Sequence, residues 1–195
     1  MTKYDFVKDF ERIWKSLKNE SERGSIIVAA AICDDILINI ISKRLIPIED
    51  KKRSFFKRDS SLISNFSARI DMAYSLGCIS ENMRKSLHII RDLRNDFAHA
   101  SVPICMQDSS VKDRLKNLLE LNRKFVEFFW KEARSDIFLS LSVSPPEIKN
   151  EDLLSDILHH AGHRHAYEIW ASAFIANLGE SIETVMRIEK YESPA

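Results

Sequence analysis

The stretch RDLRNDFAHA, residues Arg91–Ala100, decides how this chain folds. It mixes charged and apolar side chains with a spacing that suits a helix with one buried face and one polar face. One stripe of that helix consists of Met83, Leu87, Ile90, Arg94 and Phe97. A second, wholly polar stripe consists of Arg84, His88, Arg91, Asn95 and His99. Arg94 therefore falls among apolar residues, where an unpaired charge is very costly, so we expect it to have a buried partner.

Asp34 is the partner that the sequence offers to Arg94. Residues 22–45 form a long helix whose centre, Ile26–Cys33, is too apolar for a surface helix. Asp34 lies on the same face of that helix as Leu37 and Ile41. We therefore predict a structural buried pair of Asp34 with Arg94, or with Arg91, that fixes how two helices pack.

The remaining pattern predicts an all-α helical bundle of about six or seven helices. Only 4 glycines and 5 prolines occur, which favours long helices. The expected helices cover 4–19, 22–45, 61–76, 81–99, 110–133, 152–160 and 166–190, with the four from 22 to 133 as the core. Ser21 and Ser80 are expected N-caps, and Gly77 an expected C-terminal stop. Phe138–Val143 alternates like a short strand, although a helix is also possible there.

The pair Pro145–Pro146 is the clearest boundary in the chain. We expect a core domain over residues 1–140 and a C-terminal helical extension over 147–195 that packs on it.

Charge and cysteine content limit the function. The 29 basic and 29 acidic residues give a net charge of zero, so no global field attracts DNA, and direct sequence-specific DNA binding is not expected. Three widely spaced cysteines without a CxxC motif are typical of reduced thiols in a cytoplasm. The sequence has no signal-peptide layout and no uninterrupted apolar run near 18 residues, so we expect a cytoplasmic protein without a membrane span. The sequence contains no Gly-rich phosphate-binding loop and no HExxH motif, so we expect no cofactor.

Two local clusters allow more than one interpretation. A basic run interleaved with Phe55 and Phe56 can hold RNA by phosphate contact and stacking, or can be a solvated loop pinned by its phenylalanines. Its basic residues are Lys51, Lys52, Arg53, Lys57 and Arg58. In the cluster His159–His165, His159 and His163 have the i,i+4 spacing of metal ligands. Gly162 and the lack of a nearby acidic or cysteine ligand favour a histidine-rich loop without a metal.

Three segments together resemble the mannitol operon repressor family. They are Glu22–Gly24 leading into Val28–Asp34, Ser67–Ile70 with Ala73–Ser80, and Ile90–His99, and the resemblance covers roughly residues 20–120. It implies a small all-helical bacterial protein of transcriptional control that acts through a protein partner or as a homodimer. After about residue 125 the chain departs from the family, and its last two helices look like an added part.

A narrower resemblance concerns Arg94–His99, which is similar to the arginine–polar–three-residue–histidine motif of HEPN domains. Many of these all-α modules are metal-independent ribonucleases. The resemblance implies a catalytic set of Arg94, Asn95 and His99, with His99 as general acid or base and Arg94 stabilising charge on the phosphorane. Five helical residues separate Arg94 and His99 by about 140° around the axis, so convergence requires a helix end between them or a second protomer. We favour a regulatory role over this enzymatic alternative, in which RNA is the substrate.

Overall fold

The computed structural model describes residues 5–47, 63–101, 104–127 and 153–191. The regular structure of these residues is helical and contains no β-strand, which confirms the all-α prediction. The labelled helices are α1 (Phe6–Lys18), α2 (Glu22–Arg44), α3 (Phe66–Ser75), α4 (Glu81–His99), α5 (Ser109–Leu121) and α7 (Leu153–Thr184). Residues 138–143 lie outside the described residues, so the possible strand there stays a prediction.

Local capping chemistry sets several of these helix ends where the sequence places them. The Ser21 hydroxyl accepts a hydrogen bond from the Gly24 N–H at 3.0 Å, and that of Ser80 accepts from the Met83 N–H at 3.2 Å. Gly77 follows α3 with a φ of 68°, a left-handed conformation that glycine adopts at low cost. Its N–H donates to the Tyr74 carbonyl, which closes the helix in a Schellman-type stop.

Other helix boundaries differ from the prediction. α3 begins at Phe66 rather than near residue 61, because the Asn65 side chain provides the cap and accepts from the Ala68 N–H. α5 ends at Leu121 and a turn follows at Asn122, after which residues 123–127 are helical again; the predicted end near residue 133 lies outside the described residues. The two helices expected after residue 152 are both present within α7, where they meet without a loop at a kink whose central residue, Gly162, has a non-helical φ of 72° and ψ of 162°. α7 also ends at Thr184 rather than at residue 190.

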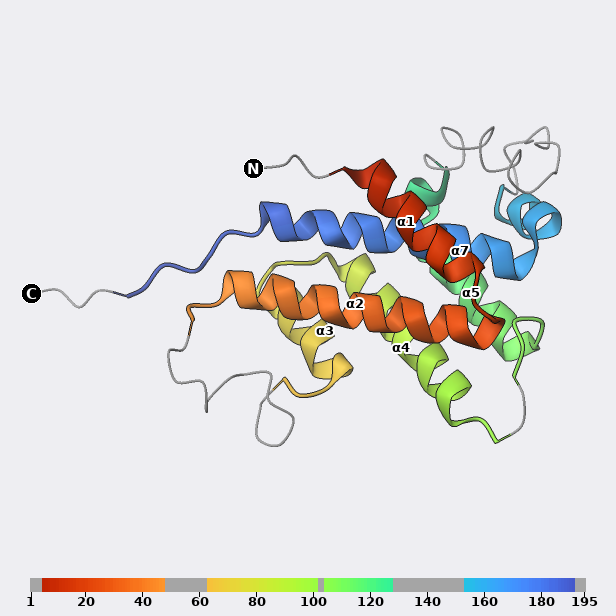
Figure 1. The fold of residues 1–195 in the computed structure, drawn as a ribbon, viewed down its shortest axis with the longest axis horizontal. Helices are drawn as coiled ribbons and strands as arrows, with labels where there is room; N and C mark the ends of the chain where they lie inside the picture. Colours follow the sequence, from red (N-terminus) through yellow and green to blue (C-terminus); the bar gives the residue numbers. More distant parts are fainter. Residues whose placement is uncertain (1–4, 48–62, 102–103, 128–152, 192–195) are drawn as a thin grey trace, which may run out of the picture.

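α2 is the central helix of the bundle, between α1 and α7 on one side and α3 and α4 on the other (Figure 1). Its buried side chains are Ser25, Ile26, Ala29, Ala30, Cys33, Leu37, Ile40 and Ile41. By length and composition alone, α2 also qualifies as a candidate membrane span. Its apolar residues are interrupted by polar ones, so it contains no uninterrupted apolar run near 18 residues. In the bundle its apolar residues are covered by four other helices, the arrangement expected of a core helix.

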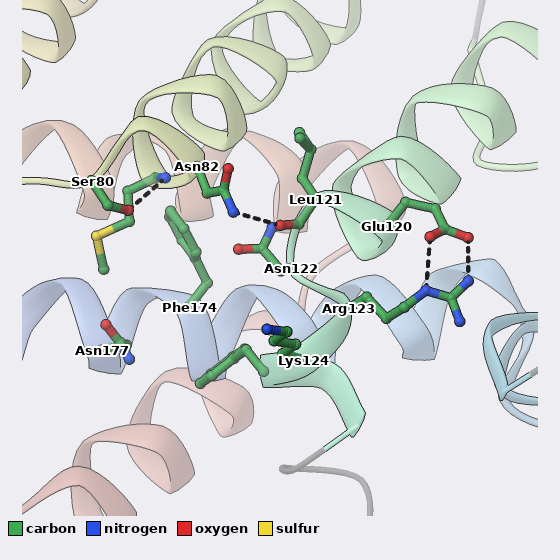
Figure 2. Close-up of a pocket in the computed structure, with 11 residues that line it drawn as sticks. Ser80, Asn82, Glu120, Leu121, Asn122, Arg123, Lys124, Phe174 and Asn177 are labelled. Atoms are coloured by element: carbon green, nitrogen blue, oxygen red, sulfur yellow. Dashed lines mark hydrogen bonds and ion pairs between the residues drawn. The ribbon is translucent and has the colours of Figure 1, made fainter. Parts of the chain in front are cut away.

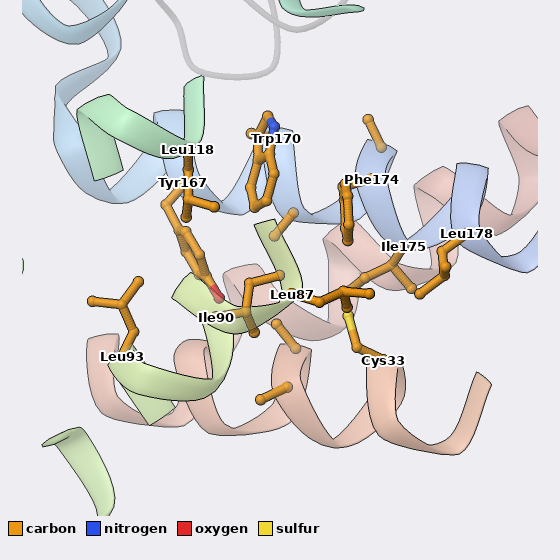
Figure 3. Close-up of a cluster of buried hydrophobic side chains, with 14 of the residues drawn as sticks. Cys33, Leu87, Ile90, Leu93, Leu118, Tyr167, Trp170, Phe174, Ile175 and Leu178 are labelled. Atoms are coloured by element: carbon orange, nitrogen blue, oxygen red, sulfur yellow. The ribbon is translucent and has the colours of Figure 1, made fainter. Parts of the chain in front are cut away.

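α7 completes the same core instead of lying beside it. Residues 166–176 of α7 are all buried, and they pack with residues of α2, α4 and α5 in one hydrophobic cluster (Figure 3). Tyr167, Trp170 and Phe174 follow one another along this face, and the last two rings stack with centroids 4.9 Å apart. The expected boundary at residues 140–147 lies outside the described residues.

The segment after α7 is fastened to the C-terminal end of α2. The Arg44 guanidinium donates to the Met186 carbonyl at 2.9 Å, and the Ile188 N–H donates to the Arg44 carbonyl at 2.9 Å. Lys43 donates to the Ile182 carbonyl. These bonds hold the final turn of α7 and the residues that follow it against α2.

Candidate functional site

The stretch that opened the sequence analysis occupies the C-terminal half of α4, which continues as helix to His99. The buried face of α4 consists of Ser86, Leu87, Ile90, Leu93 and Phe97. Leu93, and not Arg94, is therefore the core residue of the last two turns, and Arg94 is exposed. The predicted and observed faces share Leu87, Ile90 and Phe97, and the observed face is rotated by only about 30° from the predicted one.

Asp34 does form an interhelical ion pair, but its partner is Arg69 of α3. The Arg69 Nη1 atom lies 2.5 Å from Asp34 Oδ2. Its other nitrogens donate to the carbonyls of Ile63 at 3.2 Å and Ser64 at 2.9 Å. The predicted pairing of Asp34 with Arg94 is thus wrong, and so is the alternative with Arg91, which bonds Ser67 and Asp92 instead.

A signal for Arg69 was present in the sequence. Phe66, Arg69, Ile70 and Ala73 have the i, i+3, i+4, i+7 spacing of one helix face. The criterion that selected Arg94 therefore selects Arg69 as well. Because Arg69 stands near the start of its helix, free carbonyls of the preceding turn are available to its guanidinium, a condition that the middle of α4 does not meet.

The polar stripe of α4 makes a seam with α3. Asp71 accepts hydrogen bonds from Arg84 Nη1 at 2.9 Å and pairs with His88 Nε2 at 3.0 Å. The hydrogen bond with His88 is the main cause of a lowered pKa for Asp71, and Arg84 adds to it. Arg84 also lies over the ring of Tyr74, 5.1 Å from its centroid. Further along the seam, Arg91 donates to the Ser67 hydroxyl at 2.6 Å.

The end of α4 carries the predicted catalytic residues. Arg94 donates to the Asn95 side-chain oxygen at 2.9 Å, and His99 is exposed at the last helical position. Because the helix does not end between Arg94 and His99, their side chains leave its axis about 140° apart. One chain therefore brings Arg94 and Asn95 together but does not direct His99 toward them.

Neighbouring helices hold this end of α4 in place. Asp96 pairs with Arg114 of α5, and Arg23 of α2 donates to the Ala98 carbonyl at 3.0 Å. Arg23 thereby satisfies one of the carbonyls that a helix C-terminus leaves without an intrahelical partner.

The two clusters left open by the sequence have different outcomes. The basic run from Lys51 to Arg58 lies outside the described residues. The cluster His159–His165 lies within α7 rather than in a loop, and it spans the kink at Gly162, whose non-helical backbone separates the two helical segments. Burial and the charge of Lys112 lower the pKa of His163. Within the part of the chain that the structure describes, no three histidine, cysteine or acidic residues are grouped closely enough to hold a metal ion.

A second buried ion pair, which the sequence analysis missed, joins α7 to the turn between α1 and α2. Arg164 Nε donates to Glu168 Oε1 at 2.7 Å, and Glu168 is completely buried. The other end of the Arg164 guanidinium donates to the Glu20 carbonyl at 2.6 Å. The i,i+4 spacing of Arg164 and Glu168 is the signal that the sequence offers for this ion pair.

Comparison with known proteins gives one structural relative. No family model matches the sequence, and no curated protein matches it. Among solved structures, a chain of the "X-ray structure of the MtlR-HPr complex from Escherichia coli" is similar, with a TM-score of 0.57 and 14% sequence identity. The match covers 88% of this chain and 99% of that chain. At this identity the likeness shows the fold alone.

The match extends into the last helices. An alignment over 88% of 195 residues reaches far beyond residue 125. In the structure, α7 contacts α1, α2 and α5. The expected division into a core domain over residues 1–140 and a C-terminal extension over 147–195 stays a prediction, because its boundary lies outside the described residues.

Proposed function

We propose that this chain is a regulatory protein that acts by binding an HPr-type protein, and not by reading a DNA sequence. The observation that carries the proposal is the shared fold with a chain of the MtlR–HPr complex, which extends over nearly the whole of both chains. The three segments that resemble the mannitol operon repressor family support the same conclusion. They lie in α2, α3 with its following turn, and α4, which are neighbours in the bundle.

The α3–α4 seam, defined by Ser67, Asp71, Tyr74, Arg84, His88 and Arg91, is the surface that we assign to this partner. Tyrosine and arginine are enriched at protein interfaces, and here Tyr74 is 41% exposed beneath Arg84. Asp71 and Ser67 already hold the basic side chains of α4 in position. Because these side chains are already ordered, a partner that binds them loses less conformational entropy on association.

Isothermal titration calorimetry with purified Escherichia coli HPr tests the proposal. We expect saturable binding by the wild type and at least about a tenfold loss in Arg84→Glu, which places a negative charge on the seam. Lys116→Glu, at an exposed position of α5, makes the same change of charge away from the seam and should bind like the wild type. Absence of HPr binding, or a salt-sensitive complex with one specific operator DNA, would contradict the proposal.

A second candidate function is a metal-independent ribonuclease. The observation that favours it is the exposure of both Arg94 and His99 at one end of α4. Because the two side chains diverge on one helix, a composite site across a homodimer is part of this candidate.

An RNA cleavage assay in EDTA examines this candidate. We expect cleavage that rises more steeply than linearly with protein concentration and is lost in His99→Ala, whose helix content by circular dichroism stays unchanged. Equal cleavage by the wild type and by His99→Ala would rule it out. Analytical ultracentrifugation over the same concentrations measures whether the homodimer forms.

A further inference from the structure

A cavity of about 550 Å³ lies between the first turn of α4, the end of α5 and the middle of α7 (Figure 2). Its volume falls within the range of small-molecule sites. The residues around it are Ser80, Asn82, Met83, Glu120, Leu121, Asn122, Arg123, Lys124, Phe125, Phe174 and Asn177. Three helices that are far apart in sequence thus meet around one space, which lies at the opposite end of α4 from His99.

The charges around this cavity favour an anion. Glu120 accepts two hydrogen bonds from Arg123, at 3.0 and 2.8 Å, and Glu127 lies 3.8 Å from the same guanidinium, so the charge of Arg123 is balanced by its own acidic neighbours. Lys124 has no ionic partner among the described residues and is exposed. In Figure 2 it extends from the helical residues 123–127, which follow α5, toward Phe174 and Asn177 of α7. The charge left for a ligand is therefore a single ammonium group.

The uncharged lining residues favour a planar body with hydrogen-bond donors. Phe125 provides partly exposed aromatic surface, whereas Phe174 is 2% exposed and closes the cavity from the side of the core. The Asn82 amide nitrogen donates to the Leu121 carbonyl at 3.2 Å, and that of Asn122 donates to the Ser86 hydroxyl at 2.9 Å. These bonds commit the amide nitrogens to the protein, so each side-chain oxygen remains as an oriented acceptor. Such prior orientation is typical of binding sites.

We propose that this cavity binds a small organic anion with a planar ring, whose carboxylate or phosphate pairs with Lys124 while the ring packs against Phe125. This site is separate from the α3–α4 seam and does not depend on binding of HPr. Its ligand would be an effector in addition to a protein partner. Two sources share the required chemistry, aromatic carboxylates and nucleotides.

Ligand-observed NMR followed by calorimetry on the full chain tests the site. One panel contains benzoate and hydroxybenzoates, and the other contains purine and pyrimidine nucleoside monophosphates, with the matching nucleosides to measure the contribution of the phosphate. We expect saturable binding in one panel, a large loss without the anionic group, and at least about a tenfold weaker affinity in Lys124→Glu.

The matched control is Lys116→Glu, which makes the same charge change at an exposed position of α5 that does not line the cavity. It should bind like the wild type. Absence of binding in both panels would overturn the proposal, as would equal affinity of Lys124→Glu and the wild type. An equal loss in both lysine variants would mean that general charge attracts the anion, and would overturn it as well.

Discussion

Arg69 and Arg94 belong to adjacent helices, and the fold uses them in opposite ways. Arg69 is 8% exposed and has three partners, the Asp34 carboxylate and the carbonyls of Ile63 and Ser64. Arg94 is exposed, and among the described residues its guanidinium bonds only the side chain of the next residue, Asn95. The difference shows that a guanidinium enters this core where several acceptors converge on its five N–H donors, and that an apolar stripe in the sequence is not sufficient.

Arg69→Ala is the strongest way to test this comparison. The substitution leaves Asp34 without its cation and two carbonyls without a donor, so we expect a loss of about 3 kcal/mol in the free energy of unfolding. This value is at the lower end of the losses expected when one partner of a buried ion pair is removed, because the Asp34 side chain is 27% exposed to solvent. Urea denaturation followed by circular dichroism measures the loss.

Arg94→Ala is the matched control for that experiment. It removes the same side chain from a surface position and should change the unfolding free energy by less than about 0.5 kcal/mol. Similar losses in the two variants would show that Arg94 also has a structural role and would remove the contrast between the two arginines.

Glu168→Ala extends the comparison to the other buried pair. Glu168 is fully buried, but Arg164 is 34% exposed and still bonds the Glu20 carbonyl, so the cation that remains has access to water. We therefore expect a smaller loss of unfolding free energy, about 2 kcal/mol, in the range for one hydrogen bond to a charged group. Glu180→Ala, at an exposed position of the same helix, should stay within about 0.5 kcal/mol of the wild type in urea denaturation. A loss as large as that of Arg69→Ala would mean that exposure of the surviving partner does not matter.

The features that the sequence predicts correctly depend on nearby residues. Ser21, Ser80 and Gly77 act on helix ends within a few positions, so propensity and hydrogen-bond chemistry are enough to identify them. The helical character of the core segments follows in the same way from their apolar spacing.

The features that the sequence predicts wrongly depend on how helices rotate and meet. Asp34 had arginines on two helices available to it, and periodicity cannot distinguish them, because the choice depends on which helix end presents free carbonyls. How deeply residues 166–176 of α7 enter the core likewise depends on tertiary packing. The cavity beside Lys124 combines three distant segments and has no pattern in the sequence.

Asp71→Asn tests the exposed side of the comparison and has the smallest expected effect. Hydrogen bonds from His88 and Arg84 lower the pKa of Asp71 below its ordinary value of 3.8. Folding therefore favours the ionised carboxylate, and this stabilisation is fully present above pH 3.8 and is lost as the pH falls through the lowered pKa. Because Asp71 is 52% exposed and solvent screens its ion pairs, we expect Asp71→Asn to cost only about 0.5 kcal/mol at pH 7.

Urea denaturation of the wild type and of Asp71→Asn over a series of pH values from 7 downward measures this effect. We expect the difference between the two proteins to be present at pH 7 and to shrink as the pH falls through the lowered pKa of Asp71. Asp113→Asn, at an exposed position of α5, controls for the general loss of an acidic charge. A difference of several kcal/mol at pH 7, or one that does not change with pH, would show that the α3–α4 seam stabilises the fold as strongly as the Arg69–Asp34 pair does. A small and pH-dependent difference would instead leave the seam free to change its contacts when a partner binds.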